Sequence, residues 1–170
     1  GNEFLSGTGF SDDSLAETLG LGAWVDSDCT KTRLQAMRDR LQALEDWASR
    51  SCPALPSTLA SNVAVLGELL GLTPVERNLV AFVAMLHVDP TLENAAMHSG
   101  GGDRDALHVT LAHVLRVDVH LVGETLRPRG KLLDSGIVII SSGSGHTLDS
   151  RISLLSQRFV EALMLRTEDV

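Results

Sequence analysis

Apolar residues recur at alternating steps of three and four between Cys29 and Arg50, the spacing that aligns them along one side of an α-helix. Most of the residues between them are charged or amides, and the helix is expected to end before Pro53 and Pro56. We call Leu34, Met37, Leu41 and Leu44 the helix-packing seam. The seam can pack against the rest of this chain or against a partner helix in a coiled coil. The hydrophobic pattern is compatible with both arrangements.

The residues from Ser57 to about Leu126 predict a run of shorter helices. Gly71 is a natural stop for the first of them, and Thr73-Pro74-Val75-Glu76 has the form of a capping box at the start of the next. The helix that follows, to about His87, is apolar over most of its circumference and should be the core helix. Ser57 is expected to cap the first helix, with Leu70 facing inward, and Val114 to face inward from a later one. The helices expected are Ser57–Leu70, Pro74–His87, Thr91–Met97, Asp103–Arg116 and Val119–Leu126.

The hydrophobic period changes after a turn at Pro128-Arg129-Gly130. Gly136–Ile140 is β-branched and apolar, which predicts a buried strand. A Gly/Ser loop follows, and His146–Leu154 should contain the returning strand, with Ile152 and Leu154 on one side. Ser156 is expected to cap a last helix that ends near Leu165.

The order of elements predicts a mainly α fold. A helical N-terminal extension precedes a winged helix-turn-helix-like domain with one β-hairpin and a C-terminal helix. We divide the chain into an acidic, partly flexible arm (1–28, with a short helix from Ser11 to Leu19), a helical extension (29–71) and the winged-helix-like domain (72–170).

Charge is unevenly spread along the 170 residues. The 14 Lys and Arg and 22 Asp and Glu give a net charge of −8, of which −6 falls in residues 1–28 and −2 in residues 29–170. General nucleic-acid and anionic-membrane binders need a basic surface, so both classes are disfavoured. The longest apolar run, Leu79–Leu86, has eight residues and is too short for a membrane span, which needs about 20.

The sequence indicates no enzyme chemistry. The string from Gly123 to Lys131 has six residues between its glycines and lacks the spacing of a phosphate-binding loop. The histidines are not spaced as helical metal pairs. We therefore expect no catalytic, cofactor-binding or metal-binding residues in this chain.

Arg127, Arg129 and Lys131 form the one compact basic cluster, which we call the basic patch. It is the candidate interaction patch, and its partner could be phosphate, an acidic protein or the acidic arm of the same chain. DNA is disfavoured, because the helix expected to read it, Asp103–Arg116, offers only two basic side chains beside acids, and the wing 141–146 has no Lys or Arg.

Three stretches carry a family resemblance. They are Leu72-Thr73-Pro74-Val75-Glu76-Arg77 with the apolar run and Asp89-Pro90, then Leu126-Arg127-Pro128 with Leu133–Val138, and finally Ser150–Met164. Residues 66–165 thereby resemble the winged-helix region that lies N-terminal to the ATPase module in a group of AAA+ proteins. The resemblance implies that this chain is a non-catalytic fragment of a larger ATPase. ATP and Mg²⁺ would then bind only in the missing module.

The function that we expect is therefore a protein-interaction domain that recognises substrates or adaptors or helps assembly. Its partner would be another protein or the ATPase module of its own parent, with oligomers formed through the parent. A DNA-binding winged-helix regulator is the alternative, and a helical oligomerisation module that uses the seam is a weaker one. Cys29 and Cys52 stand at opposite ends of one helix, roughly 35 Å apart, so we expect free thiols and a cytoplasmic location.

Overall fold

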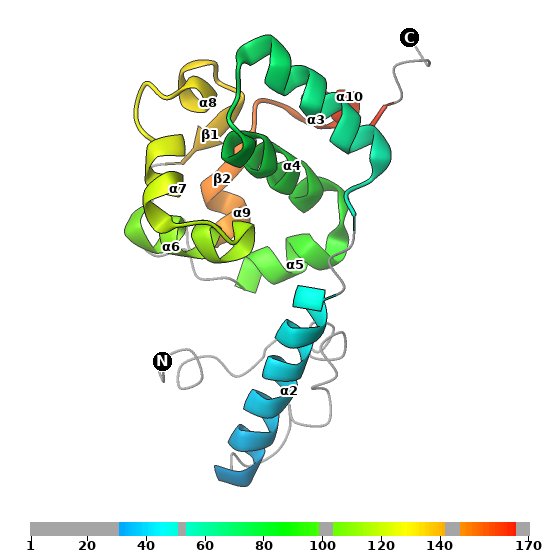
Figure 1. Ribbon diagram of the computed structural model, residues 1–170, viewed down its shortest axis with the longest axis vertical. Coiled ribbons are helices and arrows are strands. Elements are labelled where there is room, and N and C mark those ends of the chain that lie inside the picture. The colour runs from blue at the N-terminus through cyan, green and yellow to red at the C-terminus, as the bar shows by residue number, and fades with distance from the viewer. Residues whose placement is uncertain (1–30, 51–53, 99–103, 142–146, 166–170) are drawn as a thin grey trace. The chain divides into compact units, whose positions relative to one another are not determined.

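The computed structural model describes residues 31–50, 54–98, 104–141 and 147–165. The chain divides into two compact units, Gly1–Pro53 and Ala54–Val170, and each is described by itself (Figure 1). The acidic arm, the helix expected at Ser11–Leu19 and both cysteines lie outside the described residues, so the predictions made for them remain predictions.

The first unit contains the predicted helix as α2 (Lys31–Arg50). Amide and carboxylate side chains one turn apart pair along it. Gln35 Nε2 donates to Asp39 Oδ1 at 2.9 Å, and Gln42 Nε2 donates to Asp46 Oδ1 at 3.3 Å. These positions are exposed, as the pattern predicts for the polar side. The side chains of the helix-packing seam, Leu34, Met37, Leu41 and Leu44, are outside the described set, and its packing remains a prediction.

The described part of the second unit is mainly helical, with a two-stranded antiparallel sheet and a C-terminal helix, which confirms the predicted fold class. In it the longest helices precede the turn at Pro128, and the hairpin and short helices follow it (Figure 1). The elements are α3 (Ser57–Leu70), α4 (Pro74–Val88), α5 (Pro90–His98), α6 (Arg104–Leu115), α7 (Val119–Thr125), α8 (Lys131–Asp134), β1 (Val138–Ile140), α9 (Leu148–Arg151), β2 (Ile152–Leu154) and α10 (Gln157–Met164).

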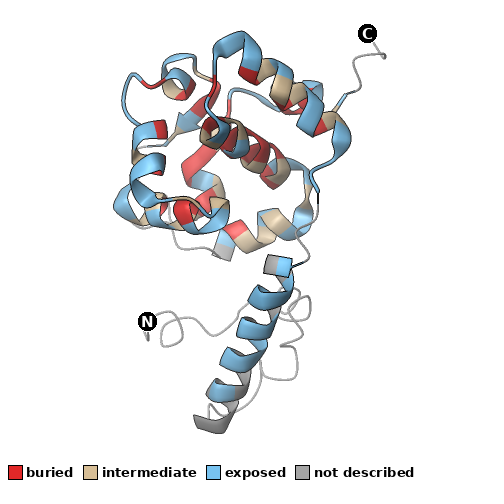
Figure 2. Cartoon of the chain, in the orientation of Figure 1, coloured by how far each residue is buried: buried red, intermediate tan, exposed pale blue. Residues whose placement is uncertain are grey.

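Helix α4 is the centre of this unit, as its sequence predicts. Buried positions run along it on several sides, and α3, α5, α6, α7, α10 and β2 all contact it (Figure 2). Its buried residues are Glu76, Leu79, Val80, Ala81, Val83, Ala84 and Leu86. An apolar side chain that is fully buried contributes about 1.5–3 kcal/mol relative to exposure, so this helix supplies a large share of the core.

The start of α4 is the predicted capping box. Glu76 Oε2 accepts a hydrogen bond from the Thr73 backbone N–H at 2.7 Å, and Thr73 Oγ1 accepts one from the Glu76 backbone N–H at 3.3 Å. Glu76 is buried. Because its carboxylate satisfies a backbone donor at the helix end, the buried charge is not left without a partner.

The hairpin is shorter than predicted. Three residues of β1 pair with three of β2, from Val138 opposite Leu154 to Ile140 opposite Ile152. Ile152 and Leu154 are both buried on one side, which confirms their predicted facing. The returning segment is strand only from Ile152, since residues 148–151 form α9.

Three details of the helix predictions are wrong. Pro56, not Ser57, stands at the N-cap of α3, and no side chain caps that end. Leu70 and Val114 are exposed. Gly67 of α3 is buried, and the Arg77 side chain from α4 lies against it, with its Cδ only 2.3 Å from where a Cβ would lie.

Helix α3 ends where predicted, at Gly71, which has φ +62°. The Gly71 N–H donates to Glu68 O, and the Leu72 N–H donates to Gly67 O at 2.8 Å. These two bonds form a Schellman motif at the C-terminal end of the helix.

Gly71→Ala should lower the free energy of unfolding by about 1 kcal/mol, because a Cβ is strained at this left-handed backbone conformation. Urea denaturation measures the change. Ser61→Ala, at an exposed position of the same helix, is the control and should stay within about 0.5 kcal/mol of the parent. Equal free energies of unfolding for the two variants would contradict the requirement for glycine at the end of α3.

Candidate functional site

The three residues of the basic patch lie in and directly after one tight turn. The Gly130 N–H donates to Arg127 O at 2.9 Å, and Arg129 has φ +66°. A Cβ at Gly130 would lie 2.9 Å from Arg127 O, so the turn leaves room only for glycine there. Arg127, Arg129 and Lys131 are all exposed. The turn therefore presents three cationic side chains within five residues.

A hollow of about 460 Å³ lies beside this turn, and we call it the α4–α7 hollow. The first turn of α4 forms one wall, and α7 with the basic turn forms the other. Arg127 and Lys131 line it, and Arg129 does not. Its lining residues are Thr73, Pro74, Val75, Glu76, Leu121, Glu124, Thr125, Arg127, Gly130 and Lys131.

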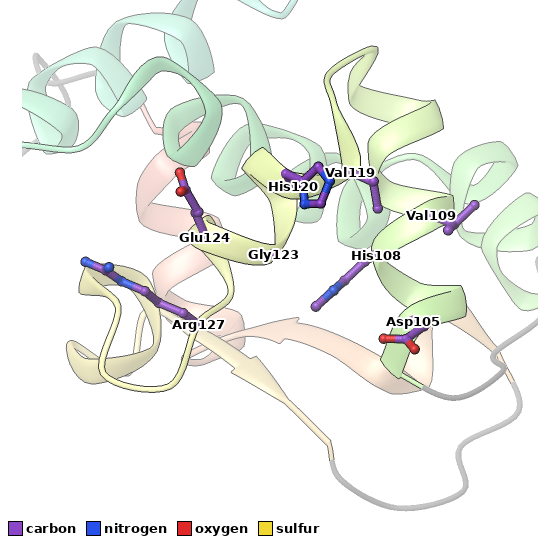
Figure 3. A pocket seen from close by; sticks show the side chains of 8 residues that line it. All are labelled: Asp105, His108, Val109, Val119, His120, Gly123, Glu124 and Arg127. Atoms are coloured by element: carbon purple, nitrogen blue, oxygen red, sulfur yellow. The ribbon is translucent and has the colours of Figure 1, made fainter.

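A second hollow of about 480 Å³ lies between α6 and α7, and we call it the α6–α7 hollow. Glu124 and Arg127 line both hollows, so the end of α7 forms the ridge between them. Figure 3 shows these two side chains diverging from that ridge. The second hollow is lined by Asp105, His108, Val109, Val119, His120, Gly123, Glu124 and Arg127.

Two side-chain contacts position these walls. Lys131 Nζ donates to the carbonyl of Gly71, which ties the basic turn to the end of α3. Arg104 Nη2 donates to the carbonyl of Leu126 at 2.8 Å, which ties the start of α6 to the residue after α7. Each contact joins a charged donor to a helix-end carbonyl, the kind of hydrogen bond that is stronger than one between neutral groups.

His108 lines the α6–α7 hollow, and its surroundings shift its pKa. Burial lowers the pKa of His108 below its usual 6.5, Arg104 lowers it further, and Asp105 partly opposes them. Its Nε2 is buried without a hydrogen-bond partner. The side chain packs near Gly123 of α7, where a Cβ would lie 3.8 Å from Nδ1.

Sequence reasoning found the basic patch but missed most of the surface around it. His108, Val109, Val119, Leu121 and Glu124 line the hollows and were not singled out. A usable signal was present for Val109, an apolar residue that was not among those expected to face inward from its helix. Of the candidate wing, 141–146, only Ser141 is among the described residues.

Two negative findings concern only the described ranges. No group of three or more His, Cys, Asp or Glu in them could hold a metal ion. No helix in them is both long and apolar enough to cross a membrane.

Comparison with known proteins assigns neither a family nor a function to this chain. No family model matches the chain, and neither the curated proteins nor the solved structures contain a significant match.

His108 should make the unit less stable in mild acid. The unfolded chain takes up a proton on this imidazole below about pH 6.5, whereas the folded chain resists it. The His108 contribution is therefore fully present above pH 6.5 and is lost as the pH falls through the lowered pKa. His108→Gln should reduce the drop in melting temperature between pH 7.5 and pH 5.5.

His113, exposed on the same helix, provides the matched control, and His113→Gln should keep the parent's pH dependence. Identical pH profiles for the parent and His108→Gln would refute this linkage.

Proposed function

We propose that this chain is a non-catalytic protein-interaction domain, and that it belongs to the N-terminal region of an AAA+ ATPase. The assignment to an AAA+ ATPase rests on the resemblance of residues 66–165 to the winged-helix region of such proteins. The interaction role rests on the surface formed by α6, α7 and the basic turn. The described helices, hairpin and C-terminal helix are compatible with a winged-helix arrangement.

The observation that carries the interaction role is the apolar character of the two hollows. Val109 is 60% exposed and Leu121 44% exposed, and Val119 is also exposed. Each lines a hollow that also contains Arg127. Apolar side chains beside an exposed Arg are typical of protein-binding surfaces, whereas nucleic-acid interfaces are more polar and more basic.

The internal use of Arg104 argues against DNA reading by α6. Its guanidinium donates to the Leu126 carbonyl, and Asp105 follows it in the first helical turn. A recognition helix needs free donors for base edges and phosphates. Arg104 is held toward the Leu126 carbonyl and has an acidic neighbour, so it is less suited to contact DNA than an unanchored Arg without that acid.

The purified chain should not bind ATP. Isothermal titration with ATP and Mg²⁺ up to about 1 mM should show no heat of binding, because no phosphate-binding loop is present in the sequence. Micromolar affinity would refute the proposed function.

The chain should also fail to retain a random DNA duplex in a gel shift at low salt. The competing DNA-binding function predicts retention that disappears when Arg127, Arg129 and Lys131 are all changed to Ala, because phosphate contacts dominate such binding. Retention of that kind would favour the regulator and refute the protein-interaction role for this surface.

A further inference from the structure

The positive charge of the second unit is concentrated at one edge of the α4–α7 hollow. Residues 54–165 contain eight Lys and Arg, and three of them are Arg127, Arg129 and Lys131. The acids in the lining are Glu76 and Glu124. Glu76 is buried and accepts the Thr73 N–H, which leaves Glu124 as the exposed acid among the lining residues. The edge of the hollow is therefore locally cationic in a chain that is acidic overall.

Both walls of the hollow carry apolar side chains. Leu121 is exposed on α7, and Pro74 and Val75 line the hollow from the first turn of α4. A volume of about 460 Å³ is within the range that small ligands and side chains fill. The hollow thus combines an apolar surface for one side chain with cations placed to meet carboxylates beside it.

Two backbone donors beside the hollow are already used. The Thr73 N–H at the start of α4 donates to the Glu76 carboxylate, and the Gly130 N–H donates to Arg127 O. Phosphate sites at helix N-termini depend on free N–H groups, so these two do not serve a phosphate. The side-chain donors of Arg127 and Lys131 suit carboxylates.

We propose that the α4–α7 hollow binds an acidic segment of a partner protein. Carboxylates of the segment contact Arg127, Arg129 and Lys131, and an apolar side chain between them packs on Leu121. This inference rests on the proposed function, since it names the partner chemistry of the same surface. The Lys131 ammonium has three donors, so it can hold the Gly71 carbonyl and a carboxylate together.

A fluorescein-labelled synthetic peptide, Asp-Glu-Leu-Asp-Glu-Leu-Asp-Asp, is the probe, and fluorescence anisotropy with the full chain gives its Kd. One comparison peptide replaces each Leu by Ser, and another replaces Asp and Glu by Asn and Gln. The acidic peptide with Leu should bind tightest, and added salt should weaken it, because exposed charge pairs are screened.

Arg127→Glu combined with Arg129→Glu should raise the Kd at least about tenfold, since two attractive contacts become repulsive. Leu121→Ser should raise it about threefold or more through lost apolar contact. Arg158→Glu is the charge-reversal control for Arg127→Glu alone, because Arg158 is exposed in the first turn of α10 and lines neither hollow. It should change the Kd less than about twofold.

Amide shift mapping on the unmutated chain keeps the test independent of any variant's folding. Peptide addition should shift the amide signals of residues 73–76 and 121–131.

The inference is overturned by amide shifts that cluster elsewhere, by equal effects of the Arg127/Arg129 and Arg158 variants on the Kd, by equal binding of the Asn/Gln peptide, or by no binding at about 1 mM. Inorganic phosphate or duplex DNA that competes with the peptide at micromolar concentration would overturn it as well. The failures of the peptide arms leave the proposed function intact, whereas binding of ATP, or of duplex DNA through the basic patch, would refute that function itself.

Discussion

The burial of α4 on several sides is the constraint on which the second unit depends. A helix with Leu79, Val80, Val83 and Leu86 buried needs neighbours around most of its circumference. Helices α3, α5, α6, α7 and α10 and strand β2 provide them. The hairpin is too short to be stable alone, so it depends on this contact as well. The capping box then sets where α4 begins, and that beginning is one wall of the α4–α7 hollow.

The surface at the basic turn is a result of how helix ends are satisfied. Lys131 holds the Gly71 carbonyl, Arg104 holds the Leu126 carbonyl, and Glu76 holds the Thr73 N–H. In each case a charged side chain serves a backbone group that the helix leaves unpaired. The same bonds decide which charges remain for a partner. Arg127 and Arg129 remain exposed, whereas Arg104 uses one of its donors within the fold.

The sequence predicted the long helices because their signals are local. Gly71, the Thr73–Glu76 capping box and the Ser156 cap, whose side chain accepts the Phe159 N–H, all lie where expected. Helices α8 and α9 were missed because four residues are too few for a hydrophobic period to show. Leu70, in the last turn of α3, was expected inward but is exposed, because periodicity does not indicate how far along a helix the rest of the unit covers it. The basic patch was found from charge spacing, whereas the hollows beside it depend on how α4, α6 and α7 meet.

The contact between α3 and α10 also bears on how fast this unit forms. Asn62 Nδ2 donates to Leu163 O at 3.0 Å and to Leu165 O at 2.8 Å, across 101 and 103 residues of chain. Closing a loop of that length carries an entropy penalty before any packing is gained, and such non-local contacts slow folding. During synthesis on a ribosome, α4 would remain partly uncovered until α10 has emerged. The apolar surface of α4 is then exposed to self-association for that interval.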